Sequence, residues 1–92
     1  MEEFNKAESC YLKAISGYNY LEDNPSLAEC YTNLGITQES DGRYDAAINS
    51  YKAALQIREE MKDKRGQGLC LNHIALIYWI QGYFDKTSEY LL

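Results

Sequence analysis

A cysteine and the only histidine of the chain stand three residues apart, at Cys70 and His73. Residues at this spacing share one face of a helix, and a cysteine nucleophile needs a nearby base and a lowered thiol pKa. The pair therefore defines one possible function, a small thiol enzyme. However, Cys70 falls on an inward position of a periodic helix, and forty residues earlier Cys30 is followed by Asn33 instead of a histidine. A buried structural thiol is the favoured interpretation.

No other residues form a pattern that could support catalysis or bind a cofactor. Metal sites need several convergent His, Cys or carboxylate ligands, and the chain has one histidine and no C-x-x-C motif. Gly66 and Gly68 match neither of the standard phosphate-binding fingerprints. The sequence therefore predicts no catalytic residue, no metal and no cofactor.

The overall composition excludes several classes of protein. The 92 residues carry a net charge of -5, which disfavours nucleic-acid binding because that requires a cationic surface. The apolar run at 74–80 is far shorter than the ~20 residues that span a bilayer, and the acidic N-terminus is unlike a signal peptide. Three cysteines (Cys10, Cys30 and Cys70) are an odd number and suit a reducing cytoplasm. We expect a cytoplasmic protein that binds neither nucleic acid nor membranes.

Periodic apolar residues predict an all-α fold of about five helices. Valine is absent and Pro25 is the only proline, which disfavours strands, and apolar residues recur at spacings of three and four. The expected helices cover about 4–21, 25–40, 44–63, 67–81 and 84–92. Asn24 and Pro25 suit a helix start, and Gly42 and Gly82 suit helix ends. Short turns make these helices antiparallel neighbours.

The chain repeats itself when it is shifted by forty residues. Small residues fall on small ones and large apolar residues on large ones: Gly35 on Ala75, Gly42 on Gly82, Leu34 on Ile74, Tyr44 on Phe84. Phe4, Ala7, Tyr11 and Ala14 likewise fall on Tyr44, Ala47, Tyr51 and Ala54. A helix pair that recurs at this period indicates a solenoid.

Part of the repeating pattern resembles the signature of the tetratricopeptide repeat. The residues that carry the resemblance are Leu34-Gly35, the run from Gly42 to Ala47, Tyr51 and Ala54-Leu55. The forty-residue period is similar to the longer variety found in kinesin light chains, in asparagine-rich mitotic adaptors and in sensory domains of bacterial regulators. This resemblance covers nearly the whole chain and implies a right-handed α-solenoid of antiparallel helix pairs. We expect residues 1–92 to form a single domain, in which 1–24 would be the second helix of a preceding repeat, 25–64 one complete repeat, and 65–92 a truncated repeat.

The signature residues have a packing role. Small residues stand where helices cross, and large ones fill the gaps between pairs. The residues in question are Tyr31, Leu34, Gly35, Gly42, Tyr44, Ala47, Tyr51, Ala54, Ile74, Ala75, Gly82 and Phe84. Gln38, in place of an aromatic residue, and Thr87, in place of alanine, depart from the pattern.

The resemblance implies that the first helix of each pair lines a concave groove. The side chains expected there are Glu29, Thr32, Asn33, Ile36, Asn72, His73, Leu76 and Trp79, with Leu69 and Ile80 beside them. Asn33 and Asn72 would bind an extended peptide backbone. Leu76, Trp79 and Ile80 would form an apolar pocket, unless Trp79 and Ile80 are simply covered by a neighbouring helix. Glu29 and Thr32 stand where an acidic peptide would need a cation, so such a ligand is disfavoured.

Three functions remain at this stage. The leading one is a non-enzymatic module that binds a protein or peptide, as the scaffold or sensing part of a larger regulatory protein. The alternative is self-association as a homodimer through the open ends of the solenoid. The end residues expected to lack cover are Phe4, Tyr11, Ile15, Tyr18, Tyr90, Leu91 and Leu92. The third is the thiol enzyme based on Cys70 and His73.

Overall fold

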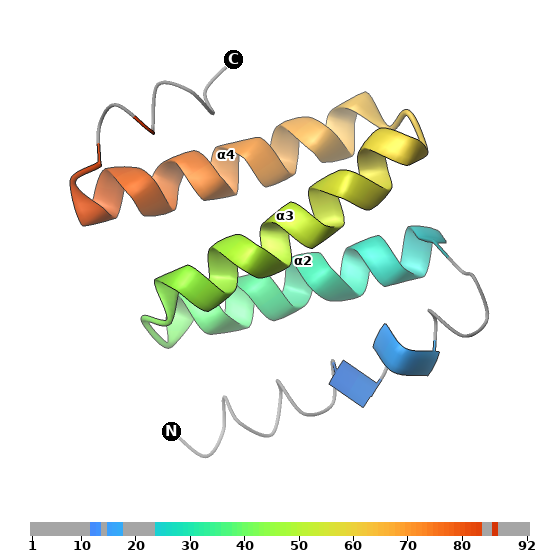
Figure 1. Cartoon of the computed structure of the whole chain (residues 1–92), viewed down its shortest axis with the longest axis horizontal. Helices are drawn as coiled ribbons and strands as arrows, with labels where there is room; N and C mark the ends of the chain where they lie inside the picture. Colours follow the sequence, from blue (N-terminus) through green and yellow to red (C-terminus); the bar gives the residue numbers. More distant parts are fainter. Residues whose placement is uncertain (1–11, 14, 18–23, 84–85, 87–92) are drawn as a thin grey trace.

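The computed structural model describes residues 12–13, 15–17, 24–83 and 86. Three long helices make up this part: α2 (Asn24–Ser40), α3 (Tyr44–Glu60) and α4 (Lys64–Gln81), coloured teal, green to yellow, and orange in Figure 1. No strand occurs among the described residues, and the all-α prediction is confirmed. Residues 12–13 and 15–17 are helical, as the first expected helix requires. Most of that helix and of the fifth, including Phe84, lies outside the described residues.

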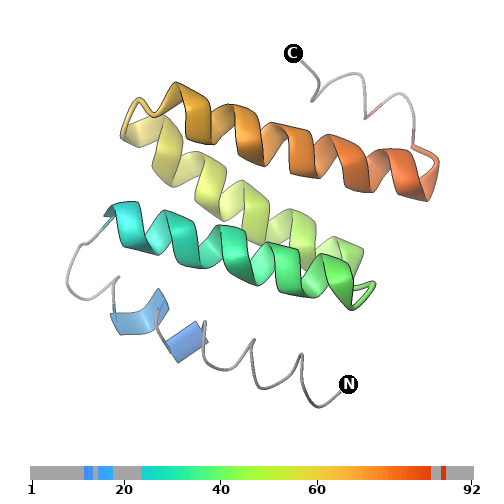
Figure 2. The same cartoon turned by 180° about the vertical axis from the view of Figure 1, so that it is seen from behind.

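The three helices form two layers. Helix α3 packs against both α2 and α4 and lies in front of them in Figure 1. The view from behind in Figure 2 shows α2 and α4 in front and α3 behind them. The first helices of successive pairs therefore form one layer and the second helix of the complete pair forms the other, as in a tetratricopeptide-like solenoid.

The same backbone turn ends all three helices. After α2, the Gly42 amide donates to the backbone carbonyl of Glu39 (3.0 Å), and the Arg43 amide donates to that of Gln38 (2.9 Å). After α4, forty residues later, the Gly82 amide donates to the carbonyl of Trp79 and the Tyr83 amide to that of Tyr78. Gly42 and Gly82 have φ angles of 78° and 83°, a left-handed conformation that glycine adopts without a steric penalty. Both predicted helix ends are confirmed.

The boundary between α3 and α4 differs from the prediction. The third expected helix ended at about residue 63 and the fourth began at about residue 67, whereas α3 ends at Glu60 and α4 begins at Lys64. Lys62 takes the left-handed turn position with a φ of 60°, and Asp63 caps α4 by accepting a hydrogen bond from the Gly66 amide (3.0 Å). Lys62 thus takes the place that Gly42 and Gly82 have after α2 and α4, and the Asp63 cap starts α4 three residues earlier than expected.

Asp63 also joins the two helices electrostatically. Its carboxylate accepts a hydrogen bond from Arg58 Nη1 of α3 at 3.1 Å. The hydrogen bond from the Gly66 amide lowers the pKa of Asp63, with a further contribution from Arg58. A lowered pKa means that the ionised carboxylate stabilises the folded chain.

We expect Asp63→Ala to lower the melting temperature more than Asp63→Asn, because asparagine still caps a helix but carries no charge. The difference in melting temperature between the parent and Asp63→Asn should have its full size above about pH 3.8, the pKa of this carboxyl group in the unfolded chain. It should shrink as the pH falls through the lower pKa of the folded state. Thermal melts at a series of pH values measure this, and a difference that does not change with pH would contradict it.

Two groups of buried side chains hold the helices together. Ala47, Ile48 and Tyr51 of α3 pack against Ile74, Ile77 and Tyr78 of α4. Ile15 packs against Leu27 and Leu34 of α2. Ile15 was expected to be poorly covered, and this prediction is wrong: the side chain is 7% exposed, because α2 covers it. The other end residues expected to lack cover lie outside the described residues.

Gly35 of α2 lies directly against the ring of Tyr51. Tyr51 is fully buried, and a Cβ atom at Gly35 would lie 2.7 Å from its Cε1 atom. The hydroxyl of Tyr51 donates to Glu39 Oε1 of α2 at 2.8 Å. Glycine is therefore required where α2 crosses the ring of Tyr51.

Gln38 departs from the aromatic pattern, but its polar group is satisfied. Gln38 and Ser50 are both buried, and the Ser50 hydroxyl donates to Gln38 Oε1 at 2.6 Å. A hydrogen-bonded pair across α2 and α3 thus takes the place of apolar packing at this position, since a buried polar group needs a partner.

Candidate protein-binding face

Helices α2 and α4 present apolar and amide side chains to solvent. Exposed apolar side chains share this surface: Ile36 (42% exposed), Leu69 (47%), Leu76 (48%), Trp79 (59%) and Ile80 (51%). Glu29 and Asn72 are also exposed, and Asn33 is half-buried. We name these eight residues the α2–α4 face. Their spacings of three, four and seven place them on one side of each helix.

The two asparagines lie at the edges of shallow hollows. Asn33 lines an open hollow of about 230 Å³ with Glu29 and Cys30. Asn72 lines a larger one of about 550 Å³ together with Leu69 and Arg58. Each amide thus lies beside a depression of the surface.

Thr32 does not belong to this face, contrary to the prediction. The side chain is 5% exposed, its hydroxyl donates to the Ala28 carbonyl (2.9 Å), and it accepts from Arg58 Nη2 (3.4 Å). A threonine hydroxyl often bonds back to the carbonyl one turn earlier. Because Arg58 of α3 donates to the same hydroxyl, Thr32 faces α3 and acts in packing.

His73 takes part in packing between the helices. Its ring stacks on Tyr51, with centroids 4.7 Å apart and an interplanar angle of 13°. Its Nδ1 atom lies 3.7 Å from Glu39 Oε1, the atom that also accepts the Tyr51 hydroxyl hydrogen bond. The side chain is 26% exposed, so only part of it reaches the surface. His73 of α4 thus packs on Tyr51 of α3 and lies next to Glu39 of α2.

Cys70 lies in an environment that opposes thiol chemistry. The residue is fully buried, and burial raises its pKa, an effect stronger than the opposing influence of Arg58 and Thr32. Nucleophilic cysteines have lowered pKa values and are partly exposed. His73, the proposed base, is stacked on Tyr51. The contacts of the two residues are those of a structural core.

Within the described residues, no three His, Cys, Asp or Glu side chains gather in a way that would hold a metal ion. Among the described helices, none has the length and apolar character needed to cross a membrane.

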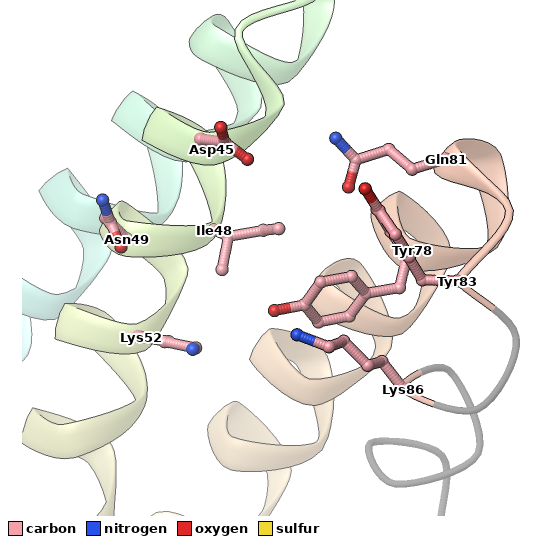
Figure 3. A pocket seen from close by; sticks show the side chains of 8 residues that line it. All are labelled: Asp45, Ile48, Asn49, Lys52, Tyr78, Gln81, Tyr83 and Lys86. Atoms are coloured by element: carbon pink, nitrogen blue, oxygen red, sulfur yellow. The ribbon is translucent and has the colours of Figure 1, made fainter.

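One surface feature was not predicted from the sequence. Asp45, Asn49 and Lys52 of α3 line an open pocket with Tyr78 of α4 and Lys86. Their spacing of four and three along α3 places them on one helix face. Charged residues on such a helix face are usually only solvated. The opposing residues lie near the end of α4 and just after it (Figure 3). Only the folded chain brings them together.

Comparison with known proteins supports the helical repeat. A family model described as tetratricopeptide repeat matches residues 1–60, which include α2 and α3 of the complete pair. No solved structure matches the chain. Tetratricopeptide repeats are generally non-catalytic scaffolds that mediate protein–protein interactions. The match, the forty-residue repeat and the layered helix pairs together show that this chain belongs to the tetratricopeptide repeat family.

Proposed function

We propose that this chain is a non-enzymatic module that binds a peptide or protein segment on the α2–α4 face. The observation that carries the proposal is the row of exposed apolar side chains along α4, together with the exposed Ile36 on α2. Exposed apolar surface that is continuous usually marks a contact site. Trp79 is the most exposed of these residues, at 59%, and tryptophan is enriched among residues that dominate binding energy.

The polar residues of the face favour an extended ligand. An amide side chain can donate and accept a hydrogen bond at the same time, which matches the alternating groups of a peptide backbone. Asn33 and Asn72 come from different helices, so a ligand that contacts both must cross from α2 to α4. Glu29 makes the α2 end of the face acidic. A ligand with apolar side chains and no excess of acidic residues fits this combination.

We also propose that the protein acts in the cytoplasm, and the two free cysteines of the described residues are compatible with this. Cys30 and Cys70 are not in disulfides, and a reducing compartment keeps thiols in this form. We further propose the division into a second helix at 1–24, a complete repeat at 25–64 and a truncated repeat at 65–92. In that division the module serves as the scaffold or sensing part of a regulatory protein.

We expect Trp79→Ala and the double variant Asn33→Ala/Asn72→Ala to weaken partner binding by ~1–3 kcal/mol each while leaving the melting temperature nearly unchanged. These side chains face solvent or are half-buried, so truncation removes little internal packing. A library of short peptides displayed against the chain provides ligands, and calorimetry then measures the affinity of each variant. Gln56→Ala is the matched surface control, because Gln56 is exposed on α3 and lies outside the face.

Unchanged affinity in both the Trp79→Ala and the asparagine variants would place binding elsewhere. Failure of every peptide to bind above background would count against the proposal as a whole.

Self-association is the second candidate, and the exposure of Trp79, Ile80 and Tyr83 near the end of α4 favours it. A second copy that covers these side chains would remove apolar surface from water. Sedimentation over a range of concentrations separates the two functions. A homodimer that Trp79→Ala converts to monomer supports self-association, and a parent chain that remains monomeric at high micromolar concentration contradicts it.

A further inference from the structure

The two helices that form the α2–α4 face carry charges of opposite sign. Helix α2 holds two glutamates, Glu29 and Glu39, and no basic residue. Helix α4 holds Lys64 and Arg65 and no acidic residue. Both helices begin at the same edge of their layer, at the left in Figure 2. The charge of this layer therefore changes from negative on α2 to positive on α4.

Arg65 extends the α2–α4 face toward the start of α4. It precedes Leu69 by four residues and Asn72 by seven, and these spacings return to the same side of a helix. The open hollow of about 550 Å³ beside Asn72 is lined by Arg58, Asp63, Lys64, Arg65, Gly66, Gly68, Leu69 and Asn72. Leu69 and Asn72 thus belong both to the face and to the hollow, so a ligand on the face can continue into the hollow along α4.

The hollow on α4 keeps a positive charge after its internal ion pair is counted. Asp63 is the one acid among the described lining residues, and its carboxylate lies 3.1 Å from Arg58 Nη1. Three cationic side chains line the hollow with this one carboxylate, so positive charge remains whichever of them Asp63 pairs with. Lys64 and Arg65 are both exposed, and an anion can therefore reach them from solvent.

The smaller hollow on α2 has the opposite charge. Its described lining residues include Glu29 and Asn33 but no basic residue. Burial raises the pKa of the Cys30 thiol in this hollow, and the negative charge of Glu29 raises it further. The two asparagines of the face thus lie beside charges of opposite sign, Asn33 beside a carboxylate and Asn72 beside cations.

We propose that the segment bound on the α2–α4 face carries a carboxylate, and that this carboxylate lies in the hollow lined by Arg65, Lys64 and Asn72. A guanidinium group binds a carboxylate through two parallel hydrogen bonds, and the amide of Asn72 can donate another. Glu29 repels the same group, so the anionic end of the segment lies on α4 and away from α2. This inference rests on the function proposed for the face and adds a direction to the bound segment. A segment that is acidic along its whole length stays disfavoured by the two glutamates of α2.

The first test is a titration of the ¹⁵N-labelled chain with two small probes, followed by NMR at constant ionic strength. N-acetylleucine has one carboxylate and one apolar side chain, and N-acetylleucinamide is its uncharged match. N-acetylleucine should shift the backbone amide signals of Arg65, Gly68, Leu69 and Asn72, and N-acetylleucinamide should shift them much less.

Single substitutions assign this binding to the hollow. Arg65→Gln should weaken binding of N-acetylleucine about fivefold, as expected for the loss of one charge near an anion at a wet surface. Gly68→Leu should weaken it by filling the hollow, because a Cβ atom at this position would meet no neighbour within 4 Å. Lys13→Gln removes the same charge from an exposed helical residue outside the hollow and should bind as the parent does. Circular dichroism checks that all variants are folded.

The second test uses the tightest peptides selected for the face. Each is made with a free C-terminus, with a C-terminal amide, and with Asp and Glu replaced by Asn and Gln. Affinity lost in the amide identifies the chain terminus as the source of the carboxylate, and affinity lost on replacement of the acids identifies a side chain. A nitroxide label at the end that bears the carboxylate should broaden the signals of Leu69 and Asn72 more than that of Asn33.

Three results would overturn the inference while leaving the function proposed for the face intact. N-acetylleucine could shift none of the four signals, or its amide could be equally effective. Peptides could bind through Trp79 and yet keep their affinity both without their carboxylates and with the Arg65→Gln variant. The nitroxide label could broaden Asn33 more than Asn72. If no peptide binds at all, the proposed function and this inference fail together.

Discussion

Replacing Gly35 with leucine should lower the free energy of unfolding by about 3 kcal/mol, the upper end of the usual cost of overpacking a core. Even the first side-chain atom at this position would lie 2.7 to 2.9 Å from three carbon atoms of the Tyr51 ring. That ring cannot move away, because it is fully buried, His73 stacks on it and its hydroxyl is bonded to Glu39. Urea unfolding monitored by circular dichroism measures the loss.

Gly68→Ala is the matched control for Gly35. Gly68 also lies inside a helix, but a Cβ atom there would have no neighbour within 4 Å. Alanine favours the helix over glycine by up to ~1 kcal/mol, so this variant should be as stable as the parent or more stable. Equal unfolding midpoints for Gly35→Leu and the parent would show that α2 does not cross Tyr51 as described.

Ile77→Ala should cost ~2–5 kcal/mol of unfolding free energy, the range for truncation of a fully buried isoleucine. Ile77 is 0% exposed and packs in the cluster between α3 and α4. A small domain has only ~5–15 kcal/mol of stability in total, so this one truncation should lower the melting temperature by many degrees. Differential scanning calorimetry measures the change.

Leu76→Ala provides the comparison at the adjacent position. Leu76 is 48% exposed on the α2–α4 face, and such surface substitutions usually change stability by less than ~0.5 kcal/mol. We therefore expect its stability to equal that of the parent and its peptide affinity to fall. If Leu76→Ala were as destabilising as Ile77→Ala, then Leu76 would be a core residue and the face would be defined wrongly.

The helices, the repeat and its family were predictable from the sequence. These features depend on local properties: apolar residues at spacings of three and four, the glycines Gly42 and Gly82 in left-handed turns, and self-similarity at forty residues. The small residue at Gly35 was also predictable as a crossing point, because its neighbours fix its register. Such signals depend on the chain itself and do not require knowledge of which helices meet.

Only the tertiary structure decided which surface residues of the repeat are accessible and which are buried. Thr32 is internal because Arg58, twenty-six residues away, reaches its hydroxyl, and Gln38 is tolerated because Ser50 lies opposite it. Ile77 was also missed as a core residue, but this one could have been predicted from the sequence, because it lies three residues after Ile74. The pocket beside α3 brings Asp45 and Lys52 together with Tyr78 of α4 and with Lys86, which follows α4 in the sequence. Contacts of this kind depend on how helices distant in sequence pack, and a local pattern carries no record of them.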